Sequence, residues 1–232
     1  MIKRVKSARQ PPEQSGVVPQ VSHWGWYERG KPIIDRVLAL IGLILAFPLL
    51  VAIAVVIRLD SPGPIIFRQR RVGKNGDEFT MYKFRTMVTR ADDSLHRAAV
   101  QRFFQARSLS EAGLTTFKLQ HDPRITRIGR VLRATSLDEV LQLVNVLKGE
   151  MSLVGPRPPI AYETEMYQSH HWRRMAVQPG ITGVWQVYGR SRVSFEEMVA
   201  MDLDYIAHRS LFLDLKLILL TFGVVVNRKG GG

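Results

Sequence analysis

The chain has 232 residues and a formal net charge of +13, from 33 Lys and Arg against 20 Asp and Glu. This length accommodates one large domain or two small ones with a real core, and the excess of cations predicts a polyanionic partner: nucleic acid, anionic lipid head groups or a phosphorylated substrate. The chain contains no cysteine, which excludes disulfide frameworks and thiolate metal sites.

The N-terminal segment, residues 1–22, is basic, contains proline, glutamine and serine, and is predicted to form a disordered cationic tail. The first long apolar run begins only at Val37, a position that does not favour a cleaved signal peptide. Trp24, Trp26 and Tyr27 stand just ahead of two cations. Aromatic and cationic residues beside an apolar segment are typical of a membrane-interface anchor, although a small aromatic core cluster fits the same pattern.

An uncharged apolar run covers residues 37–57, about twenty residues, which is long enough as a helix to cross a bilayer. Pro48 lies near its middle, where it removes a backbone donor and clashes with the preceding turn. Cations flank both ends, so the positive-inside rule favours neither orientation. We therefore predict a re-entrant helical hairpin within residues 23–60, which bends at Pro48 and leaves on the face it entered. A full span and a helix buried in a soluble core are the alternatives.

Two short strands, residues 65–67 and 79–87, are predicted on either side of Asn75-Gly76. This dipeptide is a strong hairpin signal because a type I′ turn needs positive φ at both central residues. Cations are concentrated here, where they form either a solvated face or a surface toward the phosphates of lipid head groups. They are Arg68, Arg70, Arg71, Lys83 and Arg85.

Helical segments are predicted next. Residues 95–104 have a helical pattern without identifiable chemistry. Residues 123–133 repeat an arginine at every third position with apolar residues between, so this stretch either lies on an anionic membrane surface or exposes a solvated basic face. Arg133 is within about one and a half helical turns of Asp138, so the two side chains are predicted to reach one common pocket.

Ser136 is followed three residues later by Glu139, which is the pattern of a capping box, so a helix is predicted to begin here. Asp138 and Glu139 would lie in its first turn, where free N–H groups and the helix dipole favour ionised carboxylates. The pair either only caps the helix or belongs to a functional site. The buried face of the helix would contain Leu137, Val140, Leu141, Val144 and Leu147.

Three prolines surround Arg157 within residues 155–159 and restrict the backbone on both sides of it. A positioned guanidinium suits bidentate recognition of phosphate, and an incidental arginine in a proline-rich loop is the alternative. Residues 162–176 are predicted to be helical. His170 and His171 lack the i, i+4 spacing of a helical metal pair, so both are interpreted as surface residues.

Glycines punctuate residues 178–190, and such a backbone can approach a ligand closely, so Gln186 and Arg190 are possible substrate contacts. The glycine patterns of P-loops and of dinucleotide-binding folds do not occur. Residues 195–209 are predicted to form a helix with Asp202 exposed. The final apolar stretch, residues 211–226, would lie on the membrane interface or pack in the core.

Seven motifs between residues 60 and 187 together resemble the bacterial sugar transferase family, the monotopic phosphoglycosyl transferases. Each motif alone is modestly specific, whereas seven in order are highly specific, and the resemblance extends over residues 30–226. The motifs begin at Asp60 (DSPGP), Phe67 (FRQRRVG), Met81 (MYKFRTM), Asp122 (DPRITR), Ser136 (SLDE), Met151 (MSLVGPRP) and Pro179 (PGITGVWQV).

The resemblance implies an α+β, predominantly helical fold with a re-entrant membrane helix, interfacial amphipathic helices and a small β-hairpin. Residues 61–232 would form a catalytic domain on the cytoplasmic face of the bacterial inner membrane. The implied reaction moves a sugar 1-phosphate from a UDP-sugar to a polyprenyl phosphate, such as undecaprenyl phosphate, and releases UMP in glycoconjugate or exopolysaccharide synthesis. Nucleic acid is not an expected partner, and homo-oligomerisation is left open.

By the same resemblance, Asp138 would be the nucleophile that forms a covalent phosphosugar intermediate. Glu139 would assist it, and Mg²⁺ would bind at this pair. The remaining phosphate charge would be carried by Arg133, Arg157, Lys83 and Arg85.

The re-entrant helix of the family matches residues 37–57. Many members have Ser-Pro at the break, whereas Phe47 precedes Pro48 in this chain. Pro48 is still expected to bend the helix, but a serine hydroxyl that satisfies a freed carbonyl is missing.

A non-catalytic, membrane-anchored protein that binds polyanions is the alternative from another functional class. The basic tail, the cationic hairpin and the apolar anchor would all suit such a scaffold. It would leave the acidic pair and Arg157 without a purpose, and an assay with a UDP-sugar and polyprenyl phosphate separates the two hypotheses. The identity of the sugar is not predicted by any motif.

Overall fold

The computed structural model describes residues 25–88, 94–105, 122, 124–189 and 193–226 of the chain. Within these ranges most residues are helical, and the strands form two small two-stranded sheets. The predicted α+β, mainly helical class is confirmed. The predicted tail at residues 1–22 lies outside the described residues.

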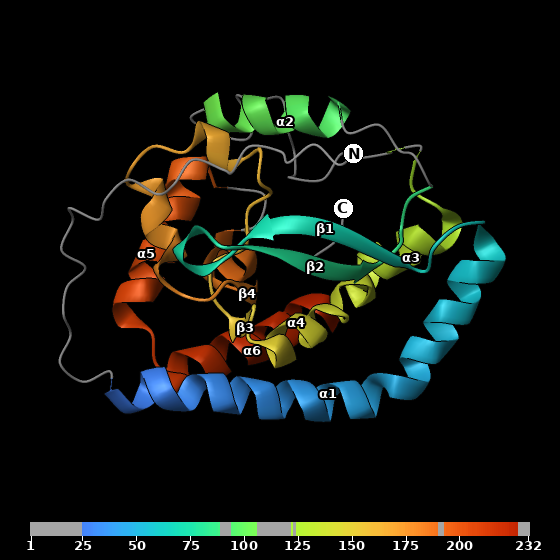
Figure 1. The fold of residues 1–232 in the computed structure, drawn as a ribbon, viewed down its shortest axis with the longest axis horizontal. Helices are drawn as coiled ribbons and strands as arrows, with labels where there is room; N and C mark the ends of the chain where they lie inside the picture. Colours follow the sequence, from blue (N-terminus) through green and yellow to red (C-terminus); the bar gives the residue numbers. More distant parts are fainter. Residues whose placement is uncertain (1–24, 89–93, 106–121, 123, 190–192, 227–232) are drawn as a thin grey trace, which may run out of the picture.

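The longest helix, α1 (Gly25–Asp60), has 36 residues and runs along one edge of the molecule (Figure 1). It is long and apolar enough to cross a membrane, and only 11% of its most apolar window is buried by the rest of the chain. Its exposed side chains are mainly large and apolar, such as Leu45 and Phe47. Because a helix in a soluble core buries such residues, α1 is suited to contact lipid.

Pro48 lies inside α1, which remains one helix and bends in its second half before the chain reaches β1 (Figure 1). Proline removes one backbone hydrogen bond and crowds the preceding turn, which is a physical cause of such a bend. The structure has a single helix that is bent, and the predicted re-entrant hairpin is not confirmed. The side of the membrane on which its ends lie stays a prediction.

The predicted β-hairpin is present. β1 (Ile66–Val72) pairs antiparallel with β2 (Glu78–Phe84), from Ile66↔Phe84 to Val72↔Glu78. Asn75 and Gly76 have the expected positive φ, 57° and 86°. The connection is longer than a two-residue type I′ loop and contains the 3-10 turn η1 (Lys74–Gly76).

The segment after the hairpin contains α3 (Arg127–Thr135), the 3-10 turn η2 (Leu137–Glu139) and α4 (Gln142–Lys148). The predicted capping box at Ser136 is wrong. Ser136 has a left-handed backbone, with φ 56°, and its N–H bonds to the last turn of α3 while its side chain caps nothing. It ends α3 in the way that a glycine or asparagine usually does, so the next α-helix begins only at Gln142.

The most buried face of α4 is partly polar, in contrast to the predicted apolar stripe. Asn145 is fully buried because it satisfies backbone groups of β2: its Nδ2 donates to Thr80 O at 2.7 Å, and its Oδ1 accepts from the N–H of Tyr82 at 3.1 Å. Leu137 and Leu141 of the predicted stripe are half-buried against Ile53 and other residues of α1. The segment is therefore held between α1 and the hairpin.

The second sheet pairs β3 (Ser152–Val154) in parallel with β4 (Gly180–Thr182). The helix predicted between them is wrong: only the 3-10 turns η3 (Thr164–Met166) and η4 (His171–Ala176) form. The N–H of Gln168 donates to His171 Nδ1 at 2.9 Å, instead of to a carbonyl one helical turn earlier. This local side-chain bond takes the place of a helical backbone bond, so the segment departs from the helix that its pattern predicted.

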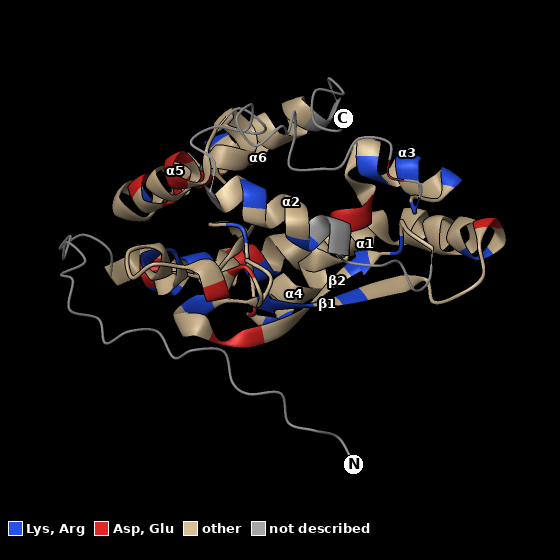
Figure 2. Ribbon diagram, turned by 90° about the horizontal axis from the view of Figure 1, so that it is seen from above, with Lys and Arg blue, Asp and Glu red and all other residues tan. Residues whose placement is uncertain are grey.

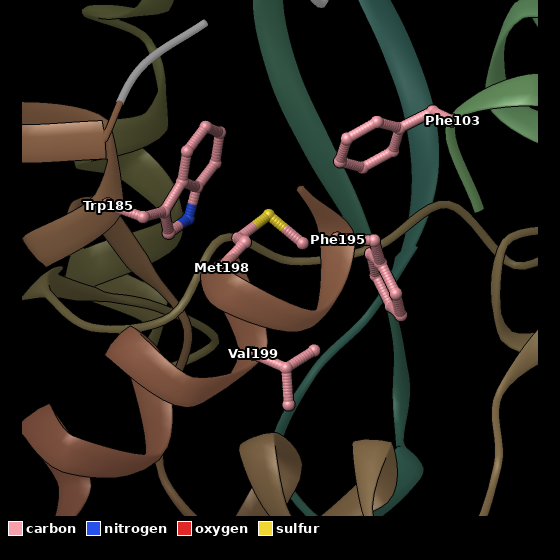
Figure 3. Packing of buried hydrophobic residues seen from close by; sticks show 5 residues of the cluster. All are labelled: Phe103, Trp185, Phe195, Met198 and Val199. Carbon is pink, nitrogen blue, oxygen red and sulfur yellow. The ribbon is translucent and has the colours of Figure 1, made fainter. Parts of the chain in front are cut away.

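α5 (Phe195–His208) begins with a capping box of Ser194 and Glu197. Asp202, which was predicted to be exposed, is buried because Arg174 Nε donates to its Oδ2 at 2.7 Å. Figure 3 shows the apolar cluster that α5 forms with α2 (Ser94–Gln105). The bounds of α2 agree with the helix predicted for residues 95–104. The cluster also includes the π-helical segment η5 (Trp185–Gly189), and its buried members are Phe103, Trp185, Phe195, Met198 and Val199.

The last helix, α6 (Leu211–Val226), has two different faces. Leu217 and Asp214 are buried, and Asp214 accepts hydrogen bonds from Tyr27 Oη at 2.9 Å and Lys31 Nζ at 2.7 Å of α1. The opposite face is apolar and exposed. It contains Phe212, Leu215, Leu219 and Phe222. The core-packing interpretation of this segment is confirmed for its buried face, and contact of the exposed apolar face with the membrane interface stays a prediction.

Candidate active site

The acidic pair Asp138 and Glu139 lies in η2, at the turn between α3 and α4. Asp138 is 9% exposed, and the Glu139 side chain is 33% exposed. Lys83 of β2 donates from Nζ to Glu139 Oε1 at 2.8 Å. The structure thus brings three of the predicted site residues together from two separate elements.

Lys83 is held in an environment that partly excludes water. Burial is the main cause that lowers the pKa of Lys83, and the negative charges of Glu139 and Asp138 oppose this shift. Arg71 adds to the lowering because it is a like charge nearby. The ammonium group therefore lies among both carboxylates and at least one further cation.

Arg133, in the last turn of α3, faces the same pair. Its Nε donates to Thr86 Oγ1 at 3.0 Å, which fixes the guanidinium next to the end of β2. Burial lowers the pKa of Arg133, and Asp138 is the strongest charge that opposes this lowering. Arg133 and Asp138 are therefore neighbours, in agreement with the sequence-based expectation. Figure 2 shows an acidic segment between α3 and α1, with basic segments of α3 and of the hairpin around it.

Arg157 lies in the proline-framed loop after β3 and keeps 37% of its side chain exposed. Its Nη1 is 3.9 Å from Glu163 Oε1. Arg157 is the strongest charge acting on Arg71, and Arg71 in turn acts on Lys83. The loop therefore places Arg157 near Arg71, and its approach to the acidic pair stays a prediction.

Arg85, a predicted phosphate ligand, is bonded to the turn between α1 and β1. Its Nη1 donates to Pro62 O at 2.8 Å, and its Nη2 donates to Ser61 O at 2.6 Å and to Ser61 Oγ at 2.8 Å. Arg85 is only 5% exposed. Its guanidinium thus fastens this turn, and its contact with a substrate phosphate stays a prediction.

The predicted substrate loop is supported less than the acidic pair. Gln186 lies in η5, where its Nε2 donates to Ile181 O at 3.1 Å, while its Oε1 is buried and accepts no hydrogen bond from the described residues. The amide nitrogen therefore braces the loop itself, and a contact of Gln186 with substrate stays a prediction. Arg190 lies outside the described residues.

One residue of the cluster was not distinguished from the sequence. Arg71 is 4% exposed, whereas Arg68 is exposed and the Arg70 side chain is 75% exposed. Side chains alternate between the two faces of a strand, so Gln69 and Arg71 share one face of β1. This alternation was the available signal, but it did not say which face would be covered.

Both adjacent histidines were predicted to be surface residues, but only His170 is exposed. His171 is 2% exposed, and its Nε2 lies 2.8 Å from Glu196 Oε1, while His170 Nε2 lies 3.1 Å from Glu196 Oε2. These three groups have the spacing of a metal site. However, His171 Nδ1 accepts the Gln168 N–H, so its proton is on Nε2. A proton there suits donation to Glu196 and opposes metal ligation, because a ligating nitrogen needs a free lone pair.

The carboxylates of Asp138 and Glu139 fit the donor chemistry of a magnesium ion. Mg²⁺ prefers hard oxygen ligands and is commonly bound by one or two carboxylates together with substrate phosphates. Both carboxylates belong to one short turn, and Glu139 already binds a cationic group, the ammonium of Lys83. The pair therefore has the composition that such an ion requires.

Comparison with known proteins identifies the family. The family model described as bacterial sugar transferase matches residues 26–228. The chain belongs to this family. Relatives of the chain are named as transferases, so the scaffold hypothesis loses its main support.

Three relatives illustrate the range of the family. Exopolysaccharide production protein ExoY of Rhizobium meliloti is 38% identical over 97% of this chain and 97% of its own length. UDP-glucose:undecaprenyl-phosphate glucose-1-phosphate transferase of Xanthomonas campestris is 40% identical over 95% of this chain. Undecaprenyl-phosphate galactose phosphotransferase of Salmonella typhimurium is 40% identical over 86% of this chain. The chain covers 45% and 41% of these two transferases, so it spans less than half of their length.

Proposed function

We propose that this transferase moves a sugar 1-phosphate from a UDP-sugar to a polyprenyl phosphate, such as undecaprenyl phosphate, and releases UMP. The names of two relatives describe this type of transfer for glucose and galactose, and the name of a third relative refers to exopolysaccharide production. The reaction would take place at the cytoplasmic face of the bacterial inner membrane, because α1 offers a lipid-facing apolar surface.

The observation that carries the proposal is the position of Asp138. Its carboxyl group is mostly buried, belongs to a short turn, and lies beside Arg133, while Lys83 binds the adjacent Glu139. Phosphoryl transfer depends mainly on positioning and on neutralisation of phosphate charge. A mostly buried carboxylate beside partly buried cations suits this chemistry.

In the first step, a carboxylate oxygen of Asp138 attacks the phosphorus that carries the sugar. A bond forms between this oxygen and phosphorus, the bond from phosphorus to the bridging oxygen of the diphosphate breaks, and UMP leaves with that electron pair. Arg133, Lys83 and Arg157 would neutralise the negative charge of the diphosphate and of the departing UMP.

In the second step, an oxygen of polyprenyl phosphate attacks the same phosphorus. The bond to Asp138 breaks, its carboxylate is restored, and the sugar is now attached to the carrier through a diphosphate. Glu139 keeps Lys83 in place throughout and adds a second carboxylate to the site. When bound to Asp138 and Glu139, Mg²⁺ would supply further neutralisation of phosphate charge.

A panel of UDP-sugars tests this proposal. Purified protein is incubated with each sugar nucleotide, with and without polyprenyl phosphate, and UMP release is measured. We expect multiple turnover only with both substrates, and intact-mass spectrometry of enzyme with UDP-sugar alone should show a phosphosugar adduct on Asp138. Turnover without any adduct would argue for direct transfer, and the absence of UMP release across the panel would contradict the proposed reaction.

A further inference from the structure

Arg71 is the most unusual charged residue near the acidic pair. It is 4% exposed, and its three hydrogen bonds go to neutral acceptors: Nε and Nη2 donate to Gln69 Oε1 at 3.1 and 2.7 Å, and Nη1 donates to Pro158 O at 2.8 Å. Among the described residues, no carboxylate forms an ion pair with it. Buried charges are normally paired, because transfer of a lone charge out of water is costly.

The charges that act on Arg71 place it inside the site. The strongest is that of Arg157, followed by the carboxylates of Glu163 and Glu139. Burial lowers the pKa of Arg71 to about 10, so the guanidinium stays protonated at neutral pH. Arg71 therefore adds a fixed positive charge that acts on the same groups as Arg157 and Lys83.

The same residue attaches the proline-framed loop to the hairpin. Besides the bond from Arg71 to Pro158 O, the N–H of Val72 donates to Pro159 O at 3.0 Å, and Arg71 forms an isolated antiparallel bridge with Ile160. The segment that carries Arg157 is thus held along the edge of β1. Prolines on both sides of Arg157 restrict the backbone, so the position of this carbonyl largely decides where the arginine lies.

We propose that Arg71 is a positioning residue for the nucleotide diphosphate: it holds the Pro158 carbonyl, and thereby Arg157, at the distance from Asp138 that the diphosphate requires. Its buried charge also adds positive potential to the site, which a neutral residue with the same hydrogen bonds would not supply. This inference rests on the proposed function.

Equilibrium binding of UDP to the full chain in detergent or nanodiscs tests the inference without turnover. Arg71→Lys keeps the charge but loses the three-bond geometry, and we expect UDP affinity to fall about tenfold, because a misplaced binding group weakens every contact it should make. Arg71→Gln loses the charge as well, and a fall of about a hundredfold is expected. Gln69→Met, which removes the acceptor of two of the bonds and leaves the charge, should shift affinity in the same direction.

Arg70→Gln is the matched control, since it removes one positive charge from the neighbouring position of β1, where the side chain is 75% exposed and pairs with Glu78. Its UDP affinity should stay within about twofold of wild type, since a surface ion pair contributes little. Steady-state kinetics give a second readout. In Arg71→Lys the KM for the UDP-sugar should rise more than kcat falls, whereas a purely structural role would lower the melting temperature and kcat with KM unchanged.

The possible outcomes separate the two proposals. If the wild type binds UDP and releases UMP while the Arg71 variants bind UDP like Arg70→Gln, the positioning role is refuted and the proposed function stands. If the wild type neither binds UDP nor releases UMP from any UDP-sugar, the proposed function is refuted, and the role of Arg71 falls with it.

Discussion

Asp138→Asn is the sharpest test of the proposed chemistry. Asparagine has the same size and shape as aspartate, so the change creates no cavity at a position that is 9% exposed. It removes one negative charge that faces Arg133 and Lys83. Loss of a charge-assisted contact of this kind costs about 1.5–3 kcal/mol of stability, so the variant should stay folded with a melting temperature lowered by several degrees.

The effect on catalysis should be much larger than the effect on stability. A neutral amide cannot attack phosphorus as a carboxylate does, and loss of a covalent nucleophile lowers kcat by about a thousandfold or more, equal to about 4 kcal/mol of transition-state stabilisation. UMP release measured with UDP-sugar and polyprenyl phosphate reports this loss, and intact mass should show no phosphosugar adduct.

Asp204→Asn is a suitable control for the loss of one acidic charge. Asp204 lies on α5 with its side chain 72% exposed and pairs with His208, so its replacement should leave UMP release within about twofold. If Asp138→Asn is folded and releases UMP at the rate of the wild type, the covalent mechanism is wrong. If both variants lose activity equally, the loss reflects net charge rather than the nucleophile.

Further outcomes are expected at other positions. Glu139→Gln should retain more activity than Asp138→Asn and require more Mg²⁺ for half-maximal rate; an unchanged metal dependence would remove Glu139 from the metal site. Because burial lowers the pKa of Lys83, its side chain loses its charge at a lower pH than an exposed lysine does. The kcat/KM of the enzyme should therefore decline on the alkaline side. A Lys83→Arg variant that keeps activity should not show this decline. The pKa of Lys83 is lower in the folded state than in the unfolded chain, so between these two pKa values the unfolded chain binds more protons. The free energy of unfolding should therefore rise with pH in that interval. A melting temperature that falls with pH there would contradict the burial of Lys83. Arg174→Met leaves Asp202 buried without its partner and should cost about 3–5 kcal/mol in chemical denaturation, whereas a loss under 1 kcal/mol would show that Asp202 finds another partner. The chain lacks cysteine, so single cysteines introduced near either end of α1 can be labelled selectively. A re-entrant helix exposes both positions to the cytoplasm, whereas labelling from opposite sides of the membrane means that the helix spans it. Pro48→Leu should shift the helix toward a span.

Several features of the fold follow from local sequence patterns. Asn75-Gly76 predicts the turn of the hairpin because these residues tolerate positive φ, and both adopt it. The uncharged run at residues 37–57 predicts a long helix because its length and composition suffice for one. Asp138 and Glu139 are adjacent in the chain, so their proximity needed no tertiary information.

Other features depended on contacts between distant segments. The pattern at Ser136 fits a capping box, but the backbone there is left-handed because the chain must end α3 and turn toward α4. Residues 162–176 have a helical pattern, yet only 3-10 turns form there, and the side chain of Arg174 is buried in a bond to Asp202 of the distant helix α5. Local propensity amounts to tenths of a kcal/mol per residue, so buried polar contacts of this kind outweigh it.

The cations of the hairpin show most clearly what each level decides. By itself the sequence determined the family, the acidic pair, the long apolar helix and an excess of arginines near them. Only the tertiary structure decided that Arg85 fastens the end of α1, that Arg71 is buried beside the loop of Arg157, and that Arg70 is exposed. The physical reason is that a long cationic side chain has no preferred environment of its own: the segments that cover it, which are distant in sequence, determine whether its charge meets water, a carbonyl or a substrate.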